Sequence, residues 1–130
     1  MSGRAEATDR LERTRCYLTG TLLPFWISRA PDPDHGGFLT YLDREGRPTG
    51  ATDKTLLMQV RVLFAMARAH RRGFGDGRCG ELARDAADFV LARYWDEEHG
   101  GWYWLADRDG TPLVAWHLYK SDAAAITPGA

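Results

Sequence analysis

A block of about seventeen residues occurs twice in this chain, and the repeat restricts the possible folds more than any other feature of the sequence. The first copy reads DPDHGGF from Asp32, followed by DREGRP, and the second reads DEEHGGW from Asp96, followed by DRDGTP. Every matched pair lies 64 residues apart, as Asp32 and Asp96 do. Self-similarity at a fixed spacing marks a repeated supersecondary unit, so two copies of one structural unit are expected.

Each copy predicts a turn followed by a short hairpin. The paired glycines stop the preceding helix and allow positive φ angles. The residues after them alternate, which places Phe38, Thr40 and Leu42 on one face of a short strand. In the Asp-Arg-Glu-Gly and Asp-Arg-Asp-Gly segments, Asp suits the start of a type I turn and Gly suits the left-handed position that closes it.

Helical patterns cover four stretches: residues 5–27, 52–72, 80–95 and 114–126. The first is expected to bend or end at Pro24, because proline disrupts a helix interior. Either Thr52 or Asp53 can cap the second. The unit is therefore a pair of antiparallel helices joined by a short β-hairpin. Stacked pairs of this kind form a solenoid or a closed α/α toroid, so an all-α fold is expected.

The second of these helices is apolar around almost its whole circumference, which predicts that it is buried. Lys54, Arg61 and Arg68 nevertheless share one narrow stripe at a spacing of seven, and Gln59 and His70 share another. One interpretation is that the cations form the only solvated edge of the helix. The other is that the stripe lines a polar cavity inside a ring of helices, where a mid-helix cation binds sugar hydroxyls and stabilises an oxyanion.

Composition and charge exclude several classes of protein. The net charge of −1 gives no reason to expect nucleic acid or an anionic membrane as a partner. Cys16 and Cys79 fit no metal-binding spacing and are interpreted as free thiols in a reducing compartment. The N-terminus lacks the apolar segment of a signal peptide, and no uncharged stretch approaches the roughly 18 residues of a membrane span. A cytoplasmic globular protein is expected.

Other chemically suggestive residues have simpler interpretations. His35 and His99 lie among acidic residues, but the ligands crowd onto one turn, so no metal site is predicted. The acidic run at residues 96–98 precedes a turn and is interpreted as a solvated helix end rather than as a pair of glycosidase carboxylates. Trp102 is assigned to hairpin packing, and Trp26 is assigned to the core.

The combined motifs resemble the N-terminal region of the N-acylglucosamine 2-epimerase superfamily, which includes cellobiose 2-epimerases and mannose isomerases. The resemblance spans roughly residues 17–119. The segments that carry it are LPFW at 23–26, HGGF at 35–38, YLDREG at 41–46, Lys54, QVR at 59–61, WDEEHGG at 95–101 and DRDG at 107–110.

The resemblance implies an (α/α)6 barrel and chemistry without a metal or cofactor. A histidine base would remove the proton at C2 of an opened aldose to form a cis-enediolate, and reprotonation would give an epimer or a ketose. Arg61, in Gln-x-Arg, and Tyr119, in Leu-Tyr, match substrate-binding positions. Since 58 residues separate them, close to the repeat length, the two are expected on equivalent inner helices. Lys54 and Gln59 are further candidates for lining the cavity.

The chain departs from the family pattern after Tyr119, and the family's acid–base histidines lie on later helices. His35, His70, His99 and His117 do not match them. The expectation is therefore a single, incomplete portion of the barrel over residues 1–130, with a disordered tail at 127–130. Its expected function is that of a sugar 2-epimerase or aldose–ketose isomerase, truncated and inactive alone, because a missing base costs on the order of 10²–10⁴ in rate.

Two other functions stay open at this stage. The chain can be a non-catalytic α/α scaffold or carbohydrate-binding module that associates with another chain, or a glycoside hydrolase or lyase on the same barrel. Two helix pairs leave apolar flanks uncovered, so self-association is expected. Arg61 and Tyr119 would contact atoms that all aldoses share, and the sequence therefore predicts a sugar substrate without naming it.

Overall fold

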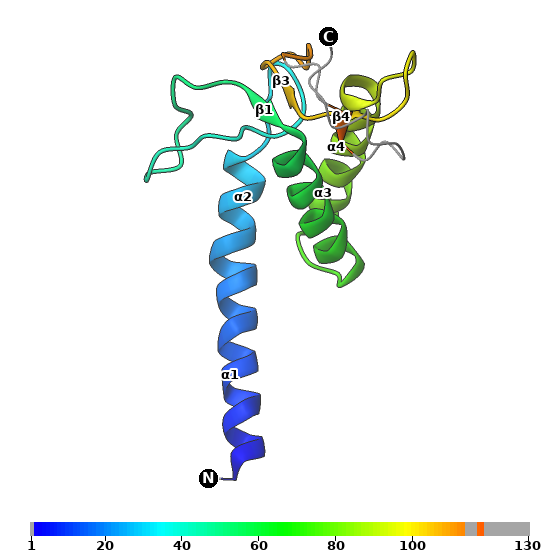
Figure 1. Cartoon of the computed structure of the whole chain (residues 1–130). Helices are drawn as coiled ribbons and strands as arrows, with labels where there is room; N and C mark the ends of the chain where they lie inside the picture. The colour runs from blue at the N-terminus through cyan, green and yellow to red at the C-terminus, as the bar shows by residue number, and fades with distance from the viewer. Residues whose placement is uncertain (1, 114–116, 119–130) are drawn as a thin grey trace.

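The computed structural model describes residues 2–113 and the backbone of 117–118. A long N-terminal helix lies beside a pair of shorter helices, and the connecting hairpins gather at one end of the molecule (Figure 1). The elements in chain order are α1 (Gly3–Tyr17), the π-helical segment η1 (Leu18–Leu22), α2 (Leu23–Arg29), β1 (Lys54–Thr55), α3 (Leu56–Arg71), α4 (Arg78–Tyr94), β2 (Trp102–Tyr103), β3 (Leu105–Ala106) and β4 (His117–Leu118).

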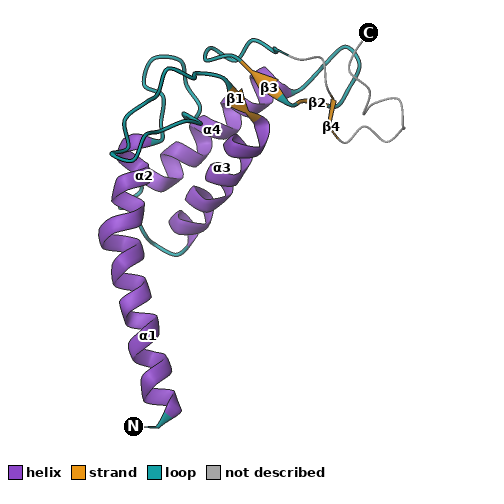
Figure 2. Cartoon of the chain, turned by 60° about the vertical axis from the view of Figure 1, so that its left-hand side comes forward, coloured by secondary structure: helices purple, strands orange, loops and turns teal. Residues whose placement is uncertain are grey.

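The N-terminal helix is continuous from α1 through η1 to α2, although a bend or an end was predicted at Pro24 (Figure 2). Proline removes one helical hydrogen bond, and its ring clashes with the carbonyl of the preceding turn. The wider π-helical segment η1 ends at Leu22, just before Pro24, and gives the ring the space that an α-helical turn lacks. The helix therefore passes the proline without breaking.

Helices α3 and α4 form the antiparallel pair that the sequence predicts, joined by residues 72–77. The start of α3 differs from the prediction, because Thr55 caps it, not Thr52 or Asp53. The Thr55 hydroxyl accepts a hydrogen bond from the backbone N–H of Met58 at 3.2 Å. Lys54 therefore lies in β1, ahead of the helix, and does not share a helical stripe with Arg61 and Arg68.

The two copies of the internal repeat form nearly the same hydrogen bonds. We call residues 32–37 and 96–101 the Gly-Gly turns. In the first, the Gly36 N–H donates to Asp32 O at 3.1 Å and the Asp32 N–H to Gly37 O at 3.0 Å. The matching distances in the second are 2.8 and 3.0 Å. In both turns the aspartate carboxylate accepts hydrogen bonds from the two backbone N–H groups of the acidic residue and histidine before the glycines.

The hairpins also match each other. We call residues 42–48 and 106–112 the Asp-Gly hairpins. Leu42 bridges to Pro48 in the first, and Ala106 bridges to Pro112 in the second. The predicted alternation after the first Gly-Gly turn is wrong in detail, because Phe38 and the next residue, Leu39, are both buried. The chain there forms isolated bridges rather than a regular strand.

The short strands form two pairs, one of which connects the two repeats. Strand β1 pairs antiparallel with β3, so that Lys54 lies opposite Ala106, and β2 pairs with β4. The helix predicted over residues 114–126 falls mostly outside the described residues. The part of it that is described, His117–Leu118, is the strand β4 and not a helix.

Two apolar clusters stabilise the fold. The larger lies between α2, α3 and α4 and includes Leu23, Phe38, Met66 and Leu82, and the smaller joins Leu56 of α3 to its α4 and hairpin neighbours. Every member of the smaller cluster lies at the end of the helix pair next to the hairpins: Leu56, Phe89, Val90, Tyr94 and Ala106. The second hairpin is therefore held against the helices by its own core.

A buried ionic cluster joins the two repeats. The side chains of Lys54 and Asp32 are both fully buried, with Nζ 2.8 Å from Oδ2. The Lys54 ammonium also donates to the carbonyl oxygens of Gly36 and Arg108, both at 2.7 Å. The Arg108 guanidinium donates to both oxygens of Asp32, at 2.9 and 3.2 Å. The first Gly-Gly turn is thus fastened to the second Asp-Gly hairpin.

Burial and pairing act in opposite directions on this cluster. Burial alone raises the pKa of Asp32, but the hydrogen bonds from Arg108 and Lys54 outweigh it and hold that pKa well below its usual range. Burial lowers the pKa of the Lys54 ammonium, and the contact with Asp32 opposes this decrease. The pair stays charged because each side chain gives the other the polar contacts that it lost when water was excluded.

Glycine is required in the first Gly-Gly turn for a reason beyond its backbone angle. A Cβ atom on Gly37 would lie 2.7 Å from the Phe89 ring and 2.8 Å from Gln59 Oε1, whereas a Cβ on Gly100 would meet nothing within 4 Å. Both residues have positive φ, 67° and 70°.

We expect Gly37→Ala to destabilise the chain by about 2 kcal/mol or more. Gly100→Ala should cost only the backbone strain of about 1–2 kcal/mol. Urea denaturation of the two variants measures the difference, and equal losses would contradict this packing.

Removing the buried cation should be far more damaging than removing an exposed one. Lys54→Met leaves Asp32 with only Arg108 and strands two carbonyl oxygens, so we expect a loss of about 3–5 kcal/mol in the free energy of unfolding. The control is Arg47→Met, which breaks exposed ion pairs with Asp43 and Glu45 and should change stability much less. Chemical denaturation at neutral pH checks the comparison. Comparable losses in the two variants would show that Lys54 does not fasten the repeats.

Candidate functional site

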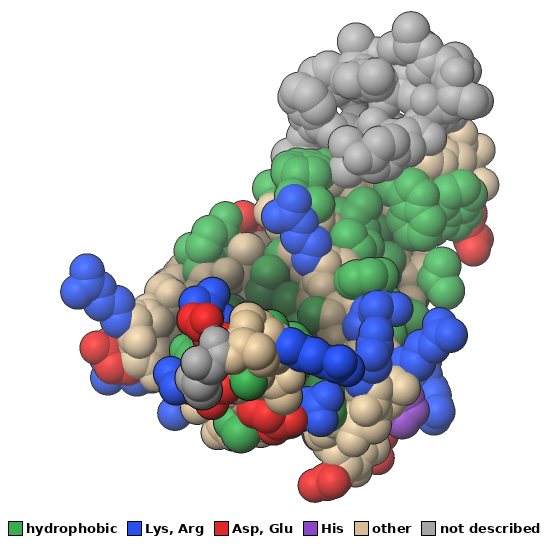
Figure 3. All heavy atoms as spheres, turned by 90° about the horizontal axis from the view of Figure 1, so that it is seen from below, with side chains coloured by type: hydrophobic (Ala, Val, Ile, Leu, Met, Phe, Trp, Pro, Cys, Tyr) green, Lys and Arg blue, Asp and Glu red, His purple; other side chains and the backbone are tan. Residues whose placement is uncertain are grey.

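Arg61 lies on the wall of an open hollow between the N-terminal helix and α3. The hollow has a volume of about 320 Å³. Among the described residues Arg61 is its only charged lining residue and forms no hydrogen bond or ion pair with any of them. The other lining residues are apolar: Leu18, Leu22, Leu23, Trp26, Met58, Val62, Ala65 and Met66. Seen from below, apolar side chains gather on this side of the molecule (Figure 3).

This arrangement can hold a ligand that is both polar and apolar. An exposed guanidinium offers up to five N–H donors in a fixed plane, suited to neighbouring oxygen atoms. Trp26, predicted to be core, lines the same hollow with 36% of its surface exposed. An aromatic face beside a free cation suits one face of a sugar ring together with its hydroxyls. Neither periodicity nor spacing identified Trp26 as a candidate site residue, because the pattern of the N-terminal helix shows only that it is apolar.

The candidates Lys54 and Gln59 are placed elsewhere. Lys54 is engaged in the buried ionic cluster, and Gln59 is fully buried. The Gln59 side chain accepts a hydrogen bond from the Phe38 N–H at 2.8 Å and donates to the Phe38 carbonyl at 2.7 Å. Neither residue lines the hollow that contains Arg61. Both hold the first Gly-Gly turn in place, and this role explains why polar side chains occur here in an apolar region.

No histidine whose side chain is described lines this hollow. His35 and His99 lie in the Gly-Gly turns, beside Asp32 and Asp96. The ring of His70 lies next to Gly80 of α4, where a Cβ atom would be 2.8 Å from it. Tyr119, the second candidate for substrate binding, lies outside the described residues, as does the expected tail at 127–130.

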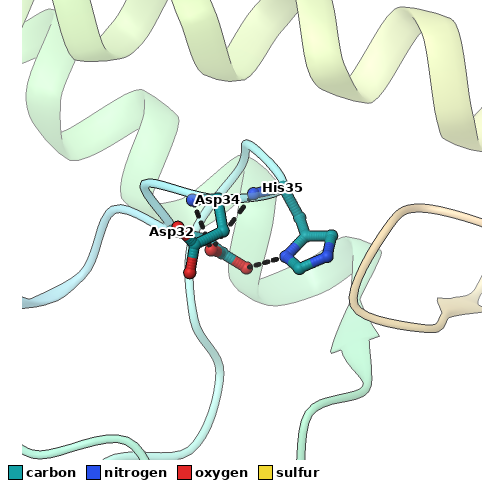
Figure 4. Close-up of side chains that lie close together, drawn as sticks. All are labelled: Asp32, Asp34 and His35. Atoms are coloured by element: carbon teal, nitrogen blue, oxygen red, sulfur yellow. Dashed lines mark hydrogen bonds and ion pairs between the residues drawn. The ribbon is translucent and has the colours of Figure 1, made fainter.

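Asp32, Asp34 and His35 come together in the first Gly-Gly turn (Figure 4), with one potential ligand atom from each residue within 4.8 Å of the others. The turn itself uses these groups, because Asp32 Oδ1 accepts the backbone N–H groups of Asp34 and His35. Lys54 and Arg108 already place two positive charges on the Asp32 carboxylate. A third cation would be repelled there, so the geometry fits a fastened turn better than a metal site.

The acidic run at 96–98 and Trp102, the remaining candidates, have the structural roles that the sequence predicts. The Asp96 carboxylate accepts hydrogen bonds from the N–H groups of Glu98 and His99, as its counterpart does in the first turn. The rings of Trp95 and Trp102 meet edge to face at 5.1 Å, which is hairpin packing. In the described part of the chain, no helix combines the length and the apolar character that a membrane span needs.

Curated relatives share this region of sequence. The chain is 30% identical over 96 residues to the cellobiose 2-epimerase of Bacteroides fragilis, a match that covers 74% of this chain and 24% of that protein. It is 32% identical over 112 residues to a mannose-6-phosphate isomerase of Rhizobium meliloti, covering 85% and 28%. The chain therefore spans about a quarter of the length of the curated relatives it matches.

Solved structures share the fold. The cellobiose 2-epimerase from Spirochaeta thermophila superposes with a TM-score of 0.77 at 28% identity, over 87% of this chain and 27% of that one. A sugar epimerase from a ruminal bacterium gives a TM-score of 0.73 at 30% identity, over 81% and 26%. The fold is thus a small part of an (α/α)6 toroid, as expected. With a family model for N-acylglucosamine 2-epimerase matching residues 36–127, the chain belongs to the N-acylglucosamine 2-epimerase family.

Proposed function

We propose that this chain supplies part of the sugar-binding cavity of a 2-epimerase or aldose–ketose isomerase. The observation that carries the proposal is Arg61, an exposed cation in the otherwise apolar hollow beside Trp26. The names of the relatives support the same class, since they act on cellobiose or on mannose 6-phosphate. In both reactions the chemistry takes place at C1 and C2 of an aldose.

The proposed reaction passes through a cis-enediolate. A base removes the C2 proton of the opened sugar, the C–H electrons form the C1–C2 double bond, and the carbonyl oxygen becomes an oxyanion. Return of a proton to the opposite face of C2, with the oxyanion collapsing to the C1 carbonyl, gives the epimer. Protonation at C1, with the C2 hydroxyl proton passing to the C1 oxygen, gives the ketose. Arg61 would donate hydrogen bonds to the oxygens at C1 and C2, where the negative charge develops. Tyr119 would make a second contact with the sugar.

We propose that the base lies outside the residues whose side chains are described, since none of the histidines among them lines the hollow. A missing base removes a contribution of on the order of 10²–10⁴ in rate. The proposal is therefore that the 130-residue chain binds the sugar without turning it over alone.

A non-catalytic α/α module that associates with another chain is the second candidate, and the exposed apolar side chains favour it. Phe64 on α3 is 65% exposed, Leu91 on α4 is 61% exposed, and Leu11 on α1 is 71% exposed. Exposed apolar side chains mark a binding surface where they form one contiguous patch, so this candidate requires that such a patch includes some of these residues. This candidate and the first differ in whether Arg61 contacts a sugar.

The chain as it stands should not exchange the C2 proton of a sugar. Incubated in D₂O with mannose or N-acetylmannosamine, it should leave the C2 proton signal of the sugar unchanged by NMR, because no described histidine faces the hollow. The full-length Spirochaeta thermophila epimerase with cellobiose serves as the positive control for the assay. Exchange by the 130-residue chain well above a buffer blank would contradict the placement of the base.

Arg61 can be tested in a chimera in which this chain replaces the superposable first quarter of the Spirochaeta thermophila enzyme. We expect Arg61→Met to lower kcat/KM for epimerisation by about 10²–10³, the cost of removing one oxyanion donor. The matched control is Arg68→Met, two turns further along the same helix, which should retain the activity of the parent chimera. If both variants are equally active, Arg61 does not bind the substrate and the module interpretation is favoured.

A further inference from the structure

Gln59 of α3 binds a peptide group that also holds the N-terminal helix. Its Nε2 donates to the Phe38 carbonyl at 2.7 Å, and its Oε1 accepts the Phe38 N–H at 2.8 Å. The peptide group between Phe38 and Leu39 also donates its N–H to the carbonyl oxygen of Ala30 at 2.7 Å, at the C-terminal end of α2. One planar peptide unit therefore connects α3 to α2 through hydrogen bonds on both of its sides.

The two helices joined by this peptide form the walls of the hollow that contains Arg61. Arg61 lines it from α3, and Trp26 lines it from α2. The Ala30 N–H donates to the Trp26 carbonyl at 2.9 Å, so Ala30 and Trp26 lie one helical turn apart. Gln59 precedes Arg61 by two residues, a rotation of about 200° around the helix. The hydrogen bonds of Gln59 therefore fix one side of α3, and Arg61 leaves the helix on nearly the opposite side.

Gln59 is the polar member of the buried side of α3, a helix that lies wholly in the described part of the chain. The buried residues of this helix are Leu56, Gln59, Met66 and Ala69. Apolar burial is non-directional, whereas a hydrogen bond weakens steeply as its angle departs from linear. Two hydrogen bonds from one planar amide therefore restrict the rotation of α3 about its axis more sharply than its apolar neighbours do.

The Gly-Gly turn does not itself require a glutamine. The second Gly-Gly turn forms the same hydrogen bonds as the first, and the residue 64 positions after Gln59 is Ala123. Trp102, the counterpart of Phe38, pairs its backbone through β2 with β4 instead. Formation of the turn therefore does not depend on Gln59, whereas the link from α3 to α2 does.

We propose that Gln59 is a positioning residue for Arg61, which it holds against Trp26 across the hollow through the peptide between Phe38 and Leu39. This inference rests on the proposed function of Arg61. A rotation of α3 by about 10° moves a side-chain end at the rim of the helix, roughly 5–6 Å from the axis, by about 1 Å. Misplacement of that size costs on the order of 10² in rate. Loss of the two hydrogen bonds therefore lowers catalysis without removing an atom that contacts the sugar.

A double-mutant cycle tests the proposal in the chimera with the Spirochaeta thermophila enzyme, which contains this whole chain. Gln59→Met keeps the length of the side chain and removes both hydrogen bonds. It should lower kcat/KM for epimerisation by about 10–10², mainly through kcat, because the weakened contact is with the transition-state oxyanion. In a chimera that already carries Arg61→Met, the same substitution should lower kcat/KM less than about twofold, since no guanidinium is left to misplace.

Two further variants separate positioning from stability. Gln59→Asn keeps the amide but is one methylene too short to reach Phe38 in the same way, and it should show the same coupling to Arg61. Leu82→Ala removes a buried side chain of α4 and no hydrogen bond, so its kcat/KM per folded molecule should stay within about twofold of the parent chimera despite a lower stability. Circular dichroism measures the folded fraction of each variant at the assay temperature.

The outcomes distinguish this inference from the proposed function. Losses at Gln59 that disappear in the Arg61→Met background support the positioning role. If Arg61→Met lowers kcat/KM, three results overturn that role and leave the proposed function standing: Gln59 variants as active as the parent chimera, losses that add in full to that of Arg61→Met, or Gln59 variants that do not fold. If Arg61→Met leaves kcat/KM unchanged, the proposed function itself fails.

Discussion

The junction between the two repeats of this chain depends on one buried cation, Lys54. An ammonium group removed from water is costly unless its protons find acceptors, and here they reach Asp32, Gly36 and Arg108. These acceptors come from both repeats, so the ammonium is satisfied only when the first turn and the second hairpin are in register. The Lys54 carbonyl also accepts the Tyr94 hydroxyl at 2.9 Å, which ties the end of α4 to the start of α3.

Local patterns predicted the elements well and the long-range polar contacts poorly. The Gly-Gly turns, the Asp-Gly hairpins and the α3–α4 pair depend on residues close in sequence, and the structure confirms them. The sequence predicts Lys54 in a helical stripe because three residues near it can cap a helix. Only the pairing of β1 with β3 shows that the strand continues to Thr55. Gln59 likewise contacts a backbone group 21 residues away, which periodicity does not reveal.

The repeat was a better guide to the C-terminal region than helical composition was. His117 and Leu118 match Asp53 and Lys54 in the 64-residue register, so that Leu118 in β4 corresponds to Lys54 in β1. In that register Tyr119 matches Thr55, so the 58 residues between Arg61 and Tyr119 are six fewer than the repeat length.

The exposed core residue Phe25 and the hollow that contains Arg61 lie next to each other, so whatever covers one affects the other. Phe89 is buried because the neighbouring repeat places a Gly-Gly turn over it, and Phe25 is exposed where the matching place is open. Trp26, the next residue, lines the hollow that contains Arg61. A surface that covers Phe25 would therefore approach one wall of that hollow and exclude water from it. A lower dielectric there would strengthen the interaction that we propose between Arg61 and a developing oxyanion. In a stacked-repeat protein, the surface that covers an exposed core residue such as Phe25 therefore also lowers the dielectric constant of the adjoining hollow.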